Sequence, residues 1–157
     1  MNKKIAVFLA ISVMSLSGCA AGKAVRTSAS TMMVTVSAAP ACGGIGAADY
    51  AAKFAAIETI KAGFDGYVIA GGAAQNNVKI TALPGTANTT GVVTGNMYSE
   101  QTTYTPGPII PMGSHDQQLS IKMFKRGEAG FSDAVDARQV LGPDWEELVK
   151  NGKNTCG

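Results

Sequence analysis

The stretch from residue 32 to residue 72 constrains the fold more than any other part of this 157-residue chain. The run MMVTVSA over 32–38 is β-branched and apolar, which predicts a strand, and Pro40 with the glycines after it ends that strand. The run GYVIAGG over 66–72 predicts a second strand, and the residues between have the composition of a helix. A strand–helix–strand unit normally sets two parallel strands with the helix across one face of the sheet.

The helix in this unit has an apolar face. Tyr50, Phe54 and Ile57 recur at helical spacing, and alanine, a strong helix former, fills most of the positions around them. Gly63 stands where a glycine ends a helix. We therefore expect the helix to stop just before Gly63 and to pack its apolar face on the sheet.

Two further strands are predicted on either side of a long loop. Residues 78–82 alternate apolar and polar side chains, as in a half-buried strand that could pair with its predecessor as a hairpin. Residues 117–125 alternate in the same way and predict the last strand. Residues 84–113, rich in Gly, Thr, Asn and Pro, predict a long irregular loop with poor edge strands around 92–93 and 102–104. Long loops in small domains are often functional, and simple mobility is the alternative.

Two short helices are expected near the C-terminus. Ser132 is the predicted N-cap of the first helix and Gly142 its end. The second helix covers 143–152 and docks Trp145 on the body of the protein. Together these elements predict a single α+β domain over 32–157, α/β-like in its strand–helix–strand core, with a small mixed sheet and a C-terminal helix pair.

The first residues have the pattern of an export signal. Lys3 and Lys4 form a basic start, and 5–14 is an apolar run of about ten residues, within the 7–15 of a secretory signal. A membrane span needs about 20 apolar residues, so this run is too short to be one. Residues 1–18 are therefore predicted to be a signal peptide.

The segment LSGC at 16–19 resembles the lipobox of bacterial lipoproteins, in which a small residue precedes a cysteine. The resemblance implies cleavage before Cys19, a thioether-linked diacylglycerol on its sulfur and an acyl chain such as palmitate on the new N-terminus. Ordinary secretion with cleavage around Ala20–Ala21 is the alternative. In Gram-negative lipoproteins an Asp after the cysteine resembles an inner-membrane retention signal, so Ala20 favours the outer membrane, facing the periplasm, with cell-surface exposure left open.

The residues after Cys19 show no periodicity. The stretch AAGKAVRTSAST is small and polar, and 19–31 is therefore expected to be a lipidated flexible tether. Random-coil scaling gives such a segment a reach of about 20 Å.

The chain has three cysteines, Cys19, Cys42 and Cys156. An odd number in an exported protein normally suggests a free thiol. If Cys19 carries lipid, as the lipobox resemblance implies, an oxidising periplasm favours a disulfide between the other two. A metal or redox thiol pair is the alternative, but it usually shows close spacing such as Cys-x2-Cys, which is absent here.

The stretch YAAKFAAIETIKAGFDGYVIAGG is similar to small bacterial envelope lipoproteins of uncharacterised function, in which an alanine-rich helix ends in Gly-(Phe/Tyr)-Asp before a strand. A more distant similarity is to the Rcs stress-sensor lipoprotein family, whose members are lipidated, disulfide-bridged α/β domains on a flexible tether. The resemblance implies a place in the cell envelope, and it assigns no further residue a role.

Charge and chemistry exclude several classes. The chain has 13 Lys and Arg against 11 Asp and Glu, and losing Lys3 and Lys4 with the signal leaves 11 of each, without the basic face that a nucleic-acid partner requires. The only histidine, His115, lies between Ser114 and Asp116, but adjacent side chains point apart and cannot form a Ser–His–Asp relay.

No other cluster points to catalysis or to a cofactor. The glycines at 43–46 precede a helix as a phosphate loop would, but the Gly-Lys-Ser/Thr signature is absent. Four acids are expected on solvated helix faces and ends: Glu58, Asp65, Asp133 and Asp136. We predict no catalytic, cofactor-binding or metal-binding residue, and no cofactor.

These observations favour a non-catalytic outer-membrane lipoprotein, a binding or sensor module of the cell envelope. Its partners would be the lipid bilayer, through acylated Cys19, and an envelope protein of unknown identity met through a surface such as 84–113. A structural or assembly accessory that self-associates is the alternative, and a hydrolytic enzyme ranks last.

Overall fold

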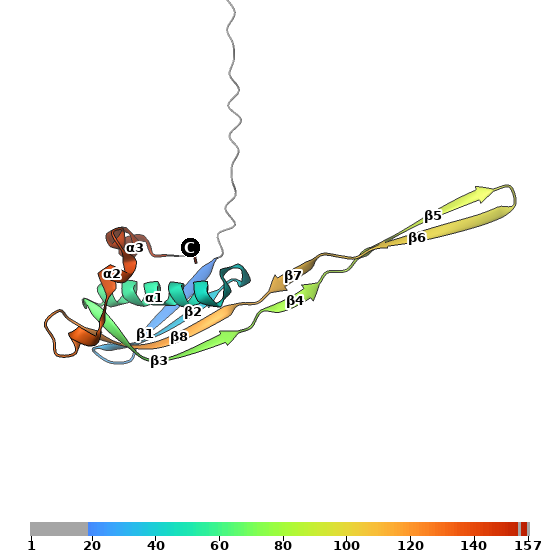
Figure 1. Ribbon diagram of the computed structural model, residues 1–157. Coiled ribbons are helices and arrows are strands. Elements are labelled where there is room, and N and C mark those ends of the chain that lie inside the picture. Colours follow the sequence, from blue (N-terminus) through green and yellow to red (C-terminus); the bar gives the residue numbers. More distant parts are fainter. Residues whose placement is uncertain (1–18, 154, 157) are drawn as a thin grey trace, which may run out of the picture.

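The computed structural model describes residues 19–153, 155 and 156 of the chain. It is an α+β structure, as expected, with one sheet, one long helix and a long projecting hairpin (Figure 1). The five-stranded sheet has the order β1-β2-β8-β3-β9. Its strands are β1 Ala20–Arg26, β2 Thr31–Ala38, β3 Gly66–Asn76, β8 His115–Phe124 and β9 Val135–Asp136.

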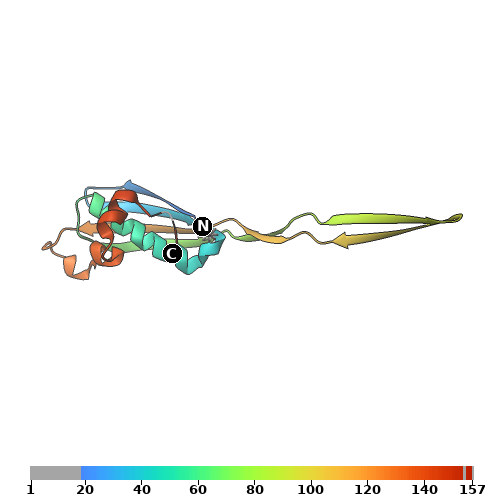
Figure 2. The ribbon, with the colours of Figure 1, turned by 90° about the horizontal axis from the view of Figure 1, so that it is seen from above.

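Helix α1, Gly43–Lys61, lies across one face of this sheet, and the short helices α2, Ala137–Leu141, and α3, Trp145–Asn151, pack beside it (Figure 2). Alternate residues of β2 and β8 point into the layer between sheet and helix. The largest fully buried side chains come from four elements: Val34 and Val36 on β2, Tyr50, Ile57 and Thr59 on α1, Tyr67 on β3, and Ile121 and Met123 on β8.

The predicted strand–helix–strand unit is confirmed as β2, α1 and β3. Strand β8 lies between β2 and β3 and is antiparallel to both, so β2 and β3 run in the same direction without touching. All strand pairs among the described residues are therefore antiparallel, where a mixed sheet was expected. Gly63 ends α1 with a φ of +84°, as predicted.

The predicted flexible tether over 19–31 is wrong for most of its length. Residues 20–26 form β1, which pairs with β2 over its whole length. The inward positions of β1 are Ala, Gly and Ala, so they give no hydrophobic pattern in the sequence. Gly22 is small for a packing reason, because a Cβ there would lie 2.8 Å from the ring of Phe54 on α1.

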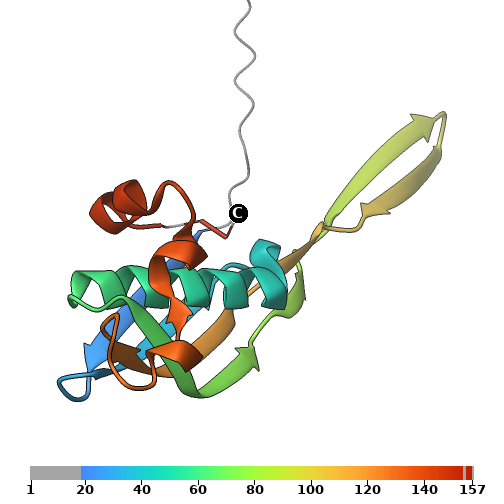
Figure 3. The ribbon, with the colours of Figure 1, turned by 60° about the vertical axis from the view of Figure 1, so that its left-hand side comes forward.

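Strands β3 and β8 continue far beyond the sheet as a two-stranded arm, which Figures 1 and 3 show projecting away from the helices. The inner part of the arm pairs β4, Lys79–Ala82, with β7, Ile109–Met112, and the outer part pairs β5, Thr86–Thr94, with β6, Met97–Thr105. The register stays constant from the Gly71–Ser120 pair to the Thr94–Met97 pair that closes the tip.

Two sequence predictions fail in the arm. The strand predicted at 78–82 pairs with β7 and not with its predecessor β3, because it continues in the direction of β3 instead of folding back. The irregular loop predicted at 84–113 is mostly regular strand, and the weak edge strands expected at 92–93 and 102–104 are parts of β5 and β6. Threonine, which favours strands, outweighs the glycine and asparagine there.

The C-terminal helix pair is confirmed, but the first helix begins later than predicted. Ser132 lies in the short 3-10 helix η2, Phe131–Asp133, and is not the cap of α2. Asp136 is the N-cap, and its side chain accepts hydrogen bonds from the backbone N–H groups of Arg138 and Gln139. Helix α2 starts later than predicted because the two residues of β9 are extended and pair with β3.

Candidate functional site

Cys19 is the first described residue, and its thiol is exposed and free of the disulfide. Its backbone forms an antiparallel bridge with Thr155, and its carbonyl accepts a hydrogen bond of 3.0 Å from the N–H of Ala39. Cys19 is thus held at the end of the sheet by neighbours on two sides. The rest of the lipobox and the predicted signal peptide, 1–18, lie outside the described residues.

The predicted disulfide is present between Cys42 and Cys156, whose Cα atoms are 5.6 Å apart. It fastens the tail to 3-10 helix η1, Pro40–Cys42, next to the first turn of α1. A second tie comes from Tyr50, whose hydroxyl donates a 2.6 Å hydrogen bond to the carbonyl of Lys153. Burial raises the pKa of Tyr50 above its usual value. The C-terminal segment is therefore anchored against the same end of the domain as Cys19.

The outer arm, β5 and β6, is exposed along its whole length. Every residue of the two nine-residue strands is exposed, including Tyr98 at 65% and Tyr104 at 63%. Glu100 is its only charged residue. The outer arm is thus an extended surface with a single charge, rich in threonine, tyrosine and valine.

The two tyrosines lie over glycines on the other side of the hairpin, Gly91 in β5 and Gly85 just before β5. A Cβ on Gly91 would meet the Tyr98 hydroxyl oxygen at 2.6 Å, and a Cβ on Gly85 would collide with Tyr104. The hydroxyls of Thr89 and Thr102 hydrogen-bond across the strands at 2.8 Å. One face of the outer arm therefore carries an ordered row of aromatic and hydroxyl groups.

Two joints connect the arm to the sheet. At the inner joint Gly113, with a φ of +109°, lies against the carbonyl of Asn77, where a Cβ would not fit. At the outer joint Gly107 lies equally close to Leu83, and the prolines of this region are Pro84, Pro106 and Pro108. The paired backbone continues through both joints, with Asn77 N–H bonded to Ser114 O and Leu83 N–H bonded to Pro108 O. The two strands therefore keep their register through both joints.

A polar cluster fixes the root of the arm. The carboxylate of Asp116 accepts hydrogen bonds from the Ser37 hydroxyl at 2.7 Å and from the Asn77 side-chain amide at 2.6 Å. Hydrogen bonds from Ser37, Ser114 and Asn77 hold the pKa of Asp116 below its usual value. His115 pairs through its backbone with Ala38 on one side and Asn76 on the other. The Asp116 carboxylate is thus engaged in holding strands together.

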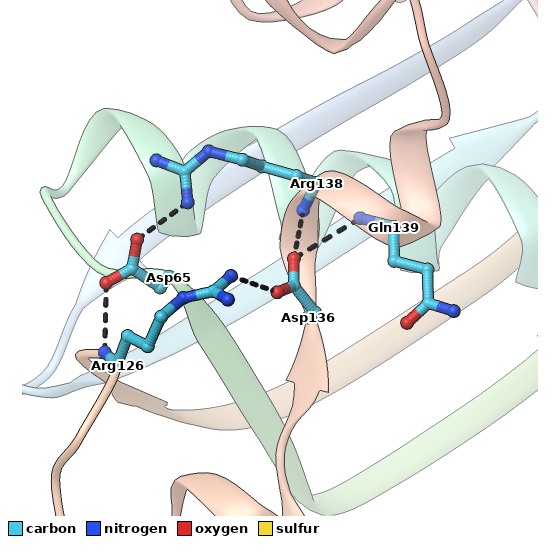
Figure 4. A network of polar contacts seen from close by, with 5 residues as sticks. All are labelled: Asp65, Arg126, Asp136, Arg138 and Gln139. Atoms are coloured by element: carbon cyan, nitrogen blue, oxygen red, sulfur yellow. Dashed lines mark hydrogen bonds and ion pairs between the residues drawn. The ribbon is translucent and has the colours of Figure 1, made fainter.

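A network of two acids and two arginines ties the opposite end of the sheet together (Figure 4). Arg138 contacts Asp65 at 2.6 Å, and Arg126 contacts Asp136 at 2.6 Å. The second oxygen of Asp65 accepts the backbone N–H of Arg126 at 3.0 Å. The Arg138 guanidinium, with the Arg126 N–H, holds the pKa of Asp65 below its usual value.

Sequence reasoning placed Asp65 and Asp136 on solvated faces and missed this network. Both oxygens of each carboxylate accept hydrogen bonds from N–H donors, so both acids are engaged in structural contacts. The only signal in the sequence was the Asp-Ala-Arg spacing of an N-cap at 136–138. The network therefore links the start of β3, the end of β8 and α2.

The face of the sheet opposite α1 carries shallow hollows, and no helix of the described residues covers it. Met33, Gly71 and Ser120 line one hollow, and Thr35, Gln75 and Gln118 line another. Within the described residues, no group of three His, Cys, Asp or Glu side chains is placed to hold a metal ion. The same residues contain no helix that is both long and apolar enough to cross a membrane.

Comparisons with family models, with curated proteins and with solved structures found no match for this chain.

Proposed function

We propose that this chain is a non-catalytic interaction module of the bacterial cell envelope, anchored to the outer membrane by lipid on Cys19, and that the arm is the element that meets its partner. The observation that supports this proposal best is the exposure of every residue of β5 and β6. The carboxylates of the ion-pair network and of the Asp116 cluster are engaged in structural contacts.

The energetics of the arm favour a role in contact. An isolated two-stranded hairpin is at best marginally stable in water, and the core of this protein contains no residue of the arm. Of 77–114 only Lys79 and Glu100 are charged, although exposed β-structure is normally kept soluble and unpaired by charges. Ordering the arm therefore costs conformational entropy that no contact with the core offsets. Contacts with a partner would offset it.

The position of Cys19 determines how such a module would sit on a membrane. The strand β1 begins directly after Cys19, so acyl chains on its sulfur would hold the folded domain at the bilayer without an intervening linker. Cys19 lies beside the row Ala38, His115 and Asn76, where β3 leaves the sheet as the arm. At about 4.8 Å per strand spacing, β8 is about 10 Å and β3 about 14 Å from β1, which starts at the anchor. The anchor would therefore hold the root of the arm close to the membrane surface.

Site-specific photocrosslinking in membranes tests the role of the arm. A photoreactive aromatic amino acid replaces Tyr104 on the arm or Glu146 on α3, which is also exposed. We expect discrete adducts from position 104 and only background from position 146, since the two positions share the chain and its anchor. Equal, diffuse labelling at both positions would contradict the proposed role of the arm.

Metabolic lipid labelling tests the anchor separately. Cys19→Ser should lose the label completely, because the acyl chains require the sulfur, whereas Cys42→Ser should keep it despite the broken disulfide. A fully labelled Cys19→Ser protein would refute the anchor.

A further inference from the structure

We infer that the outer arm pairs with the outer arm of a second copy of this chain, strand β6 against strand β6, to form a four-stranded sheet of the order β5-β6-β6-β5. This inference rests on the proposed function, because it specifies what the arm contacts. Three features of the outer arm support it. Edge protection is absent, β6 is the more regular of its two edges, and the residues of β6 are self-complementary about their centre.

Edge protection is present on the inner arm and missing on the outer arm. Natural sheets block open edges with lysine and proline. The inner arm and its outer joint contain Lys79, Pro111 and the three prolines named above. From Thr86 to Thr105 there is no proline and no lysine. The sequence thus discourages strand addition near the domain and leaves it open at the far end.

The two edge strands of the outer arm differ in regularity. Strand β5 contains Gly91 in its interior, which weakens a strand, whereas β6 contains no glycine. The tip is a two-residue turn with Gly95 at a φ of +63°, so the closing residues Thr94 and Met97 direct their backbone groups at each other. Alternation along β6 then directs the backbone groups of its even-numbered residues outward: Tyr98, Glu100, Thr102 and Tyr104.

The sequence of β6 is self-complementary about Gln101, its central residue. An antiparallel pair of β6 strands centred there places Tyr98 opposite Tyr104 of the second copy, on the same face. It places Glu100 opposite Thr102, so the two carboxylates of the pair do not face each other. The outward backbone groups meet in this register, which is what an added antiparallel strand needs. A second copy is therefore the partner that this edge fits.

Disulfide trapping in membranes tests the register. In the proposed pair the Gln101 residues form a non-hydrogen-bonded pair with Cα atoms about 4.5 Å apart, within the range of about 4.4–6.8 Å that a disulfide spans. Gln101→Cys should therefore give at least about tenfold more disulfide-linked dimer under mild oxidation than Thr90→Cys. Thr90 is its cross-strand neighbour on β5, equally exposed and on the same face. The unsubstituted chain reports any background from Cys19.

A proline on each edge tests the strand used. In a chain that also carries Gln101→Cys, Glu100→Pro should abolish the dimer because it removes an outward N–H from β6. Thr89→Pro makes the same change on the outer edge of β5 and should leave the dimer intact. Equal dimer from Gln101→Cys and Thr90→Cys, or equal loss with both prolines, would overturn the inference. If dimers are absent while position 104 still crosslinks to a different protein, self-pairing fails and the proposed function stands. If both readouts are negative, both fail.

Discussion

One long β-hairpin is covered by α1 in the sheet and exposed to solvent in the arm. Where β3 and β8 lie under α1, side chains such as Tyr67 and Ile121 are fully buried, and the Tyr67 hydroxyl donates to the carbonyl of Ala52 on the helix. Where the hairpin leaves the sheet, Ile80, Val93 and Tyr98 are mostly exposed. The comparison teaches that backbone pairing alone does not fix the role of a strand, since only the covered part contributes a core.

Removing the disulfide should lower the free energy of unfolding the most. The loss should fall only on the part of the molecule that α1 covers. In the chain-entropy model a bridge that closes about 100 residues contributes about 4.7 kcal/mol, and Cys42 and Cys156 are 114 residues apart. The double variant Cys42→Ser, Cys156→Ser should therefore lower the free energy of unfolding by about 4–5 kcal/mol, measured by denaturant titration. An unchanged midpoint would mean that the tail is held by its other contacts.

A matched pair of isoleucine truncations separates the two regions directly. Ile121→Ala on β8 opens a cavity under α1 and should cost about 2–5 kcal/mol. Ile80→Ala on β4 removes a side chain that is 78% exposed and should cost less than about 0.5 kcal/mol. Urea unfolding of the two variants measures both. Similar costs would show that the arm shares the stability of the domain.

Acid should weaken the ion-pair network at the end of the sheet opposite the arm. The folded-state pKa of Asp65 lies below the ordinary 3.8 because of Arg138 and Arg126, so its contribution is present above 3.8 and is lost as the pH falls through the folded value. Asp65→Asn should remove about 1 kcal/mol at neutral pH, as for partly exposed ion pairs, and flatten the acid side of the stability curve. A variant with an unchanged acid limb would contradict this assignment.

The smallest effect on global stability is expected from Gly91→Val. The new side chain would displace the Tyr98 ring and disturb the outer arm, yet the domain should unfold within about 0.5 kcal/mol of the native chain. Calorimetry measures the global effect, and NMR shifts confined to 86–105 would show the local one. A large drop in the unfolding temperature would mean that the arm supports the core.

Sequence reasoning succeeded where burial leaves a pattern. The alternation in 117–125, the helical spacing of Tyr50 and Ile57, and the glycines at the ends of helices all correspond to structure. The disulfide also followed, although from cysteine counting and the lipobox resemblance instead of from any local signal. These features depend on contacts between side chain and core, which select residue types.

The failures come from places where contacts leave no apolar pattern in the sequence. Strand β1 was missed because closeness to Phe54 requires small residues at its inward positions, as at Gly22. The sequence predicts a loop for the outer arm because no face of it is buried and its residues alternate in no apolar pattern. The ion-pair network joins Asp65 and Arg138 across 73 positions, a pairing that no local pattern encodes.

Hydrogen exchange of the native chain compares the two regions in one experiment and tests the interaction role of the arm most directly. Exchange of segments 86–105 and 115–124 would be followed in dilute detergent solution and in native membranes. The account predicts slow exchange of 115–124 in both settings, and fast exchange of 86–105 in dilute solution that becomes slow in membranes. Fast exchange of 86–105 in native membranes would contradict it.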